Sequence, residues 1–272
     1  MQNRFLNETF KRLCQENQIS FESLCLGWII RIQKEEVTRY IHGYHFDLNA
    51  DTASLIAQDK YATGSILRRE NIPVLDQTYF LKMFEDEFFT KEQILEKVSH
   101  YTFPMICKPN LGSGGHDIVL VHSPQELESA VRTIHLKERG VLVSEFQKIE
   151  TEYRVVVLDD EVLLTYGKKA PDGDLRHNLS SGATAVLSLS EETQNQLSDL
   201  ARRSMRAINL TFGTVDIIEI QKRGGGVFQY EVLEINSGVC LEHFSDINKE
   251  CKEKAEGIYR KVFDMLFNRT ES

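Results

Sequence analysis

Residues 213 to 238, GTVDIIEIQKRGGGVFQYEVLEINSG, place two alternating strand patterns on either side of consecutive glycines. This pattern is typical of a β-hairpin, and a turn centred on Gly225 places Asp216 directly opposite Glu234. Asn236 follows Glu234 by two residues, so it points to the same face of the strand. The sequence therefore predicts a hairpin face that carries two carboxylates and a carboxamide.

Two carboxylates that face each other in this way need a counter-charge. Directly opposed side chains have Cβ atoms about 5 Å apart, and like charges there are destabilising. At an effective dielectric of about 20, two unit charges ~4 Å apart repel by about 4 kcal/mol. Because oxygen ligands suit Mg²⁺ or Mn²⁺, we predict a metal site at Asp216, Glu234 and Asn236. The alternative is a solvated face with a shifted register.

A second glycine-rich stretch, ICKPNLGSGGHDIVLV, spans residues 106 to 121. In a P-loop the lysine follows the glycines at the start of a helix, whereas here Lys108 precedes them and a strand pattern comes after. A flap between two strands can still bind phosphate, because glycines let successive N–H groups converge on an anion. We therefore predict phosphate contacts from Lys108 and from Ser113, Gly114 and Gly115. The alternative is an ordinary turn with a solvated lysine.

Residues 166 to 185, YGKKAPDGDLRHNLSSGATA, form a long polar loop with a small-residue end. A loop of this length inside a compact domain is usually functional or disordered. Its charges fit a lid over anionic groups, with Lys168 or Lys169 on phosphate, Arg176 on a developing negative charge and Asn178 as a neutral donor. The alternative is a set of solvated surface residues.

Other polar residues give weaker indications. Glu145 ends a strand pattern and Glu152 precedes the next one, so either acid could accept hydrogen bonds from an adenine amino group or a ribose hydroxyl. Cys240 and His243 lie close beyond the hairpin, but no base and orienting acid stand at a recognisable spacing. We interpret Cys240 as structural.

Strand and helix patterns are mixed along the chain. Helices are predicted over the first fifteen or so residues and over 52–72, 91–100, 123–135, 190–210 and 247–268. Strands are predicted over 21–32, 38–46, 77–83, 103–109, 117–123, 140–147, 153–167 (a hairpin), 212–221 and 227–236. The hairpins interrupt any strict alternation, so the fold class is predicted to be α+β rather than a doubly wound sheet.

The composition sets limits on function. The chain has 272 residues, 41% of them hydrophobic, and a formal net charge of -9, which argues against non-specific nucleic-acid binding. No apolar run is long enough to span a bilayer, and the N-terminal sequence is too polar for a signal peptide. Five widely spaced cysteines without a Cys-x-x-Cys pair are typical of reduced thiols. We therefore expect a cytoplasmic protein without membrane contact.

In their joint order, these motifs resemble the ATP-grasp superfamily over about residues 52 to 268. The resemblance is strongest to the branch that contains the ribosomal-protein glutamate ligase, with cyanophycin and glutathione synthetases as more distant relatives. It implies an ATP-grasp fold, in which two α+β subdomains grip ATP, and ATP and Mg²⁺ or Mn²⁺ as ligands. Residues 1–51 would form a reduced pre-grasp region of helix and hairpin, 52–100 a helical lead-in, 101–146 the small subdomain and 147–272 the large one.

The resemblance also implies roles for individual residues. Lys60, in IAQDKYATGSILRRENIPV, would contact the nucleotide. Glu145 and the Phe146 backbone, in VSEFQ, would contact adenine, and Glu152 would take the ribose-binding place. Lys108 and Lys169 would lie on the phosphates, with Arg176 and Asn178 nearby as catalytic residues, and the metal would bind to Asp216, Glu234 and Asn236.

Two departures affect the acceptor. Relatives often follow the metal-binding Asn with Ser-Pro-Gly, whereas this chain continues Ser237, Gly238, Val239 and Cys240. The region before the Asp-Lys helix is also short. A second subunit in a homodimer, or a macromolecular substrate, would then complete the carboxylate or amine site.

The implied activity is an ATP-dependent ligase that joins a small carboxylate to an amine of an amino acid, peptide or protein terminus. ATP would phosphorylate the carboxylate, and the amine would displace phosphate from the acyl phosphate. Two alternatives keep the ATP site, namely a small-molecule kinase that omits the second step and a non-catalytic nucleotide sensor. A phosphorylated product without an amide would identify the kinase, and ATP binding without turnover the sensor.

Overall fold

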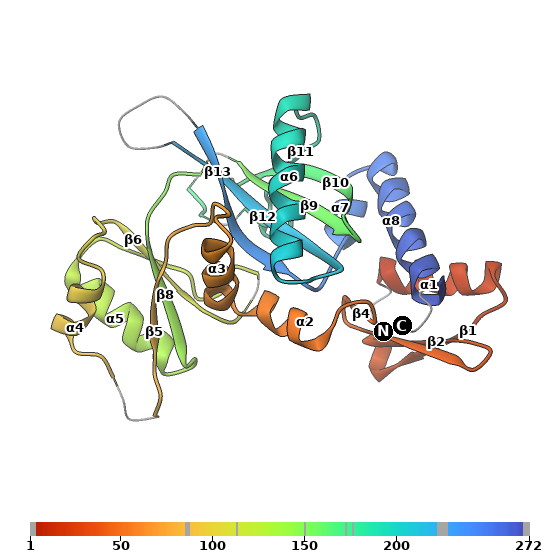
Figure 1. The fold of residues 1–272 in the computed structure, drawn as a ribbon, viewed down its shortest axis with the longest axis horizontal. Helices are drawn as coiled ribbons and strands as arrows, with labels where there is room; N and C mark the ends of the chain where they lie inside the picture. Colours follow the sequence, from red (N-terminus) through yellow and green to blue (C-terminus); the bar gives the residue numbers. More distant parts are fainter. Residues whose placement is uncertain are drawn as a thin grey trace.

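The computed structural model describes residues 4 to 268, apart from 85–87, 113, 150, 172, 176 and 222–227. Three separate sheets with associated helices form the described chain (Figure 1). The N-terminal sheet and the sheet of the small subdomain lie at opposite ends, with the large sheet between them (Figure 1). This mixture of antiparallel sheets and helices is the predicted α+β class.

The N-terminal region is a helix followed by an antiparallel meander. Its elements are α1 (Phe5–Glu16), β1 (Ser20–Leu24), β2 (Ile29–Lys34), β3 (Val37–His42) and β4 (His45–Phe46). The predicted turn between β2 and β3 is confirmed, but the prediction of only two strands is wrong. Cys25 and Leu26 have φ of 50° and 57° in the 3-10 turn η1 (Cys25–Gly27), and Gly43 has φ of 63°. Because a strand cannot continue through positive φ, each predicted strand is divided there.

Two helices connect this region to the rest of the chain, where one was predicted. They are α2 (Asp51–Gln58) and α3 (Lys60–Arg69). Asp59 has φ and ψ of -93° and 101°, and its side chain accepts a hydrogen bond from the Ala62 N–H at 2.8 Å. Aspartate is a favoured N-cap, so Asp59 starts a new helix within an apparently continuous helical pattern.

The small subdomain is a four-stranded antiparallel sheet in the order β5-β8-β6-β7. Its elements are β5 (Thr78–Leu81), α4 (Lys91–Lys97), β6 (Met105–Pro109), β7 (Val119–Val121), α5 (Pro124–His135) and β8 (Gly140–Glu145). Ser123 caps α5 as predicted, accepting from the Glu126 N–H at 3.3 Å. The strand β7 is shorter than predicted.

The large subdomain is a five-stranded antiparallel sheet in the order β11-β10-β9-β12-β13. Its elements are β9 (Glu152–Leu158), β10 (Glu161–Lys169), η2 (Leu179–Ser181), β11 (Thr184–Val186), α6 (Glu191–Ala207), β12 (Phe212–Gln221), β13 (Phe228–Asn236), α7 (Glu242–Ser245) and α8 (Lys249–Asn268). Ser190 caps α6, as the sequence predicts.

The two faces of the large sheet pack against different partners. One face, with Val155 and Ile217, packs against α6 and residues of α2 and α3. The opposite face, with Val156 and Phe212, shares a core with α1, α8 and the N-terminal sheet. Residues two apart in a strand share a face, so the second face continues from Val156 to Arg154 and from Thr214 to Asp216. One end of this face is therefore apolar, and the other end carries charged side chains.

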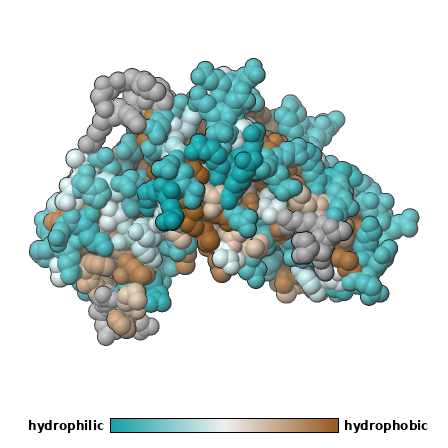
Figure 2. All heavy atoms as spheres, in the orientation of Figure 1, coloured by the Kyte–Doolittle hydropathy of each residue, from teal (hydrophilic) through white to brown (hydrophobic). Residues whose placement is uncertain are grey.

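The molecular surface in the orientation of Figure 1 is mainly hydrophilic, and apolar residues gather near the hollow at its lower edge (Figure 2). Within the described residues, no helix has the length and apolar character needed to cross a membrane.

Candidate functional site

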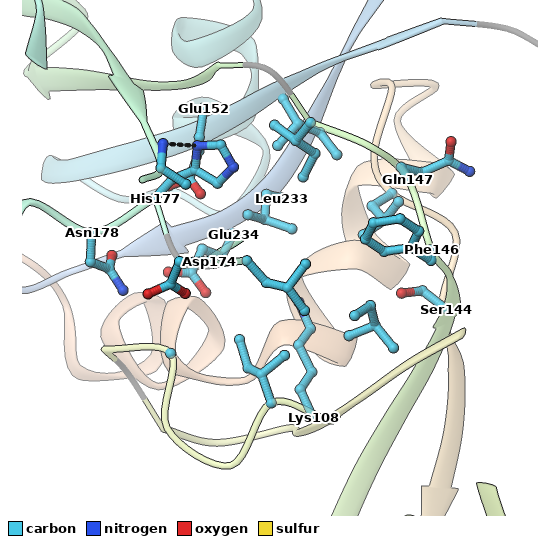
Figure 3. Close-up of a pocket in the computed structure, with 18 of the residues that line it drawn as sticks. Lys108, Ser144, Phe146, Gln147, Glu152, Asp174, His177, Asn178, Leu233 and Glu234 are labelled. Atoms are coloured by element: carbon cyan, nitrogen blue, oxygen red, sulfur yellow. Dashed lines mark hydrogen bonds between the residues drawn. The ribbon is translucent and has the colours of Figure 1, made fainter. Parts of the chain in front are cut away.

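A cavity of about 650 Å³ lies between the small subdomain and the large sheet. This size is typical of small-molecule and cofactor sites. Most of the predicted site residues line it, namely Lys60, Lys108, Gly114, Gly115, Glu145, Phe146, Glu152, Lys169, Asn178 and Glu234 (Figure 3). Ser113 and Arg176, which we also predicted, lie outside the described residues.

A buried ion-pair network lies beside the cavity. Asp216 is 1% exposed and accepts two hydrogen bonds from Arg154, at 2.8 and 2.6 Å. Lys168 Nζ lies 3.3 Å from Asp216 Oδ1 and also donates to Glu152. These four residues, on three adjacent strands, pair two buried acids with the buried Lys168 and the partly buried Arg154.

The network fixes the protonation states of its members. Burial alone would raise the pKa of Asp216, but Arg154 and Lys168 outweigh it and hold this pKa at about 2. Burial alone would lower the pKa of Lys168, but Asp216 and Glu152 raise it above the usual value. These partners therefore keep Asp216 and Lys168 charged across the physiological range.

The predicted pairing of Asp216 with Glu234 is observed, but a register shift between Asp216 and Ile217 moves the rest of the hairpin by one residue, so Ile217 pairs with Val232 and not with Leu233. Asp216 pairs with Glu234 across β12 and β13, and Thr214 pairs with Asn236. Asn236 Nδ2 lies 3.3 Å from Asp216 Oδ2 and 3.2 Å from Glu234 Oε1, so the three side chains converge. The predicted turn at Gly225 lies outside the described residues.

The donor set of this hairpin fits a hard divalent cation. Asp216 and Glu234 supply carboxylate oxygens, and the Asn236 amide supplies a third oxygen when it is turned over. No cluster of three or more His, Cys, Asp or Glu side chains suited to a metal occurs in the described part of the chain, so the amide is essential to the set. Arg154 and Lys168 already offset the charge of Asp216, a source of compensation that the sequence reasoning missed.

Lys108 presents a buried cation to the cavity. It lies on β6, is 7% exposed, and extends toward the space beneath Glu234 (Figure 3). Within the described residues, no hydrogen bond or salt bridge holds its ammonium group. Burial, against a weaker opposing effect of Glu234, lowers the pKa of Lys108 to about 8. A charged group buried without a direct partner is a recognised mark of a ligand site.

Lys60 links the glycine loop to the hairpin. From the first turn of α3, its Nζ donates to Gly112 O at 2.6 Å and lies 3.9 Å from Glu234 Oε2. The neighbouring Tyr61 N–H donates to Asn110 Oδ1 at 2.9 Å, which fixes the base of the loop. Lys60 is therefore close enough to Glu234 to form an ion pair with an anion bound beside that residue.

The glycine loop has the backbone conformation that the sequence suggested. Gly112, Gly114 and Gly115 have φ of 116°, 75° and 73°, a region that other residues rarely adopt. Gly114 and Gly115 line the cavity, so the main chain of this loop reaches the site.

Glu145, the last residue of β8, and Phe146, which follows it, already have hydrogen-bond partners within the protein. The Glu145 carboxylate accepts from Thr102, including its N–H at 3.0 Å. The Phe146 N–H donates to Pro104 O at 3.0 Å. The predicted contact of Phe146 with adenine would therefore use its carbonyl oxygen or its ring. Apolar side chains of Leu75, Ile106, Ile218 and Leu233 also line the cavity.

The loop after β10 supplies the opposite wall. Lys168 and Lys169 point to opposite faces of β10, so Lys169 lines the cavity while Lys168 is buried in the network. His177, 7% exposed, also lines the cavity, and its Nδ1 lies 3.0 Å from Lys168 O and 3.3 Å from Ala170 N. Sequence reasoning assigned no role to His177, although its position between Arg176 and Asn178 was a usable signal.

Comparisons with known proteins agree with this geometry. The family model described as RimK-like ATP-grasp domain matches residues 57–255. A probable alpha-L-glutamate ligase of Xanthomonas campestris pv. campestris (strain B100) is 32% identical over 141 residues, which cover 51% of this chain and 45% of that relative. A probable alpha-L-glutamate ligase of Xanthomonas oryzae pv. oryzae (strain MAFF 311018) is 29% identical over 196 residues, 71% of this chain and 61% of the relative.

Two solved structures share the fold. The D-alanine--D-alanine ligase from Bacillus anthracis complexed with ATP has a TM-score of 0.60 and 20% identity, covering 80% of this chain and 67% of that one. A bifunctional glutathione synthetase from Pasteurella multocida has a TM-score of 0.62 and 14% identity, and the match covers 97% of this chain and 44% of that one.

The fold and the site thus define an ATP-grasp protein, as the resemblance implied. The chain belongs to the RimK-like ATP-grasp domain family. It spans 45% of the length of the first Xanthomonas relative and 61% of the second.

Proposed function

We propose that the protein is an ATP-dependent carboxylate–amine ligase that works through an acyl phosphate. The observation that carries the proposal is Lys108, a buried cation that faces the cavity close to the acidic hairpin and has no direct counter-charge among the described residues. A bound polyphosphate would supply that counter-charge. The likeness to ligases of the same family favours this reaction over a kinase or a sensor.

The first step transfers the γ-phosphoryl group to the carboxylate substrate. A carboxylate oxygen forms the new bond to phosphorus, the bond to the bridging oxygen of ADP breaks, and ADP leaves. Lys108, Lys60 and Lys169 would neutralise phosphate oxygens, and the glycine loop would donate main-chain N–H groups. Such positioning and charge neutralisation supply most of the catalysis in phosphoryl transfer.

The second step forms the amide. The amine nitrogen attacks the acyl carbon, the bond from that carbon to the phosphate oxygen breaks, and phosphate leaves while the amine loses a proton to solvent. Asn178 would donate to the developing oxyanion, and we assign Arg176 the same task by its place in the loop. The glycine loop and the loop after β10 would exclude water, which would otherwise hydrolyse the acyl phosphate.

We also propose that the enzyme binds Mg²⁺ or Mn²⁺ together with ATP. Asp216, Glu234 and Asn236 would hold it, and the bound ion would neutralise phosphate charge. Around this set, the buried network keeps Asp216 ionised, since its pKa is lowered to about 2.

The substrates are proposed from the relatives. The names alpha-L-glutamate ligase and D-alanine--D-alanine ligase both specify amino acids. We therefore propose that an amino acid supplies the amine, with L-glutamate as the first candidate, and that the carboxylate belongs to an amino acid, a peptide or a protein terminus. The described cysteines are all unpaired, as a cytoplasmic location would require. A homodimer remains part of the proposal for the whole enzyme.

The test is phosphate release from ATP and Mg²⁺ in the presence of single amino acids, with hydroxylamine as a surrogate amine. Trapping as a hydroxamate would identify the acyl phosphate and the acid that forms it. ATP hydrolysis without hydroxamate or amide, for every acid tested, would refute the ligase. A stable phosphorylated product would instead identify the kinase.

A further inference from the structure

The strand β13 gives the site a direction. Leu233 and Glu234 line the cavity, and Asn236 is the last residue of the strand. Strands rise about 3.3 Å per residue, so Ser237 lies roughly 10 Å beyond Glu234. Ser237 and the residues that contact it therefore bound the site beyond Glu234 and Asn236.

A histidine of the N-terminal sheet occupies this side. His45, the first residue of β4, is exposed, and its Nδ1 lies 3.4 Å from the hydroxyl of Ser237, a residue only 1% exposed. A Cβ added at Gly238 would lie 3.0 Å from His45 Nε2, so the imidazole rests against this glycine. Because residue 238 is a glycine, it leaves room for the His45 ring.

The position of His45 is fixed from both sides. The Val239 N–H donates to Tyr44 O at 3.0 Å, so the main chain before His45 is bonded to the main chain after Gly238. Tyr44 also donates to Glu242 at 3.3 Å, and Glu242 accepts the Phe5 N–H of α1 at 2.7 Å. The short N-terminal region is thus joined directly to the end of the metal-binding hairpin.

The chemistry of His45 suits an amino acid. Ser237 uses Nδ1, which leaves Nε2 for a ligand. Burial and the neighbouring His42 lower the pKa of His45, so the imidazole is neutral at physiological pH. A neutral imidazole nitrogen bonds either an amine N–H or a carboxylate oxygen, depending on its tautomer, and an amino acid offers both.

We propose that His45 binds the amino acid that supplies the amine, through Nε2, so that the N-terminal sheet completes the acceptor site within one chain. This inference rests on the proposed ligase function. It replaces the expectation that a second subunit or a macromolecular substrate must complete the site.

The test compares two nucleophiles in the same enzyme. Hydroxylamine is small and carries no carboxylate, so at high concentration it reacts without being held at the acceptor site, whereas an amino acid, beginning with L-glutamate, must be held there. With ATP, Mg²⁺ and a saturating acid, hydroxamate and amide formation are measured for the wild type, His45→Ala, His45→Gln and Gly238→Ala. His122→Ala, which removes an exposed imidazole on the small subdomain, is the matched control.

We expect His45→Ala to raise the KM for the amino acid by about three- to tenfold, the effect of one hydrogen bond. Gly238→Ala should act in the same direction, because its methyl group obstructs Nε2, and His45→Gln should restore part of the loss. Hydroxamate formation should stay within about twofold of the wild type in all variants, as should both reactions of His122→Ala.

Three results would overturn the inference. These are an unchanged amino-acid KM in His45→Ala, an equal loss of both reactions with an unchanged melting temperature, and a wild type that forms hydroxamate but accepts no amino acid as amine. A wild type that forms no hydroxamate with any acid would refute the ligase function itself, a distinguishable outcome.

Discussion

Two buried lysines in this molecule have opposite electrostatic surroundings. Lys168 on β10 is 1% exposed and is bonded to Glu152 and Asp216, whose charges outweigh burial and raise its pKa. Lys108 on β6 is 7% exposed, and burial lowers its pKa to about 8. The first charge has direct partners in the fold, whereas the second has none among the described residues, and we propose that a bound anion compensates it. We therefore interpret Lys168 as a structural residue beneath the site and Lys108 as a residue that binds the ligand.

The largest expected effect concerns the two acids of the hairpin. Asp216→Asn and Glu234→Gln should each reduce phosphate release by about a hundredfold or more, because each removes a carboxylate ligand of the proposed metal ion. Only Asp216→Asn should also lower the melting temperature, since it leaves Arg154 and Lys168 without their shared partner. Full activity of either variant on an identified substrate would disprove the metal assignment.

Replacing the two lysines should change stability in opposite directions. Lys168→Met leaves the buried Glu152 without this partner and leaves Asp216 with Arg154 alone, so it should destabilise the protein by about 3–5 kcal/mol. Lys108→Met removes an uncompensated buried cation and should stabilise the ligand-free protein by about 1–3 kcal/mol. Urea unfolding of both variants measures this contrast, and destabilisation by Lys108→Met would mean that the fold already compensates this charge.

The pH dependence follows from the same difference. The pKa of Lys108 is about 8 in the folded protein and is higher in the unfolded chain, so the unfolded chain binds more protons from about pH 8 upward. The stability contribution of Lys108 should therefore rise as pH increases through this window. ATP affinity should fall over the same range, by at most about tenfold per pH unit, because binding then requires proton uptake. Titrations of the wild type and Lys108→Met check this, and the variant should lack the effect.

Local patterns were sufficient to predict much of the site. The pairing of Asp216 with Glu234 was predictable because β12 and β13 are neighbours in sequence as well as in space, although the register shift beside Asp216 was not predicted. Lys108 was recognisable because a strand on either side of a glycine loop is a local feature.

Contacts between distant residues could not be predicted in this way. Arg154 and Asp216 are 62 residues apart and meet only because β9 lies between β10 and β12 in the sheet. The helix break at Asp59 and the turn at Cys25 depend on a single cap and on positive φ, which periodicity does not reveal. His45 meets Ser237 across 192 residues, so its place in the site required the tertiary structure.

The most direct test of the account is ATP binding to the wild type and to Lys108→Met, measured calorimetrically near pH 7 with adenosine as a second ligand. Loss of a charged hydrogen bond should weaken ATP binding by roughly ten- to a hundredfold, while adenosine affinity stays unchanged. If Lys108→Met bound ATP as tightly as the wild type, the counter-charge of Lys108 would not be a nucleotide phosphate, and the central claim would be wrong.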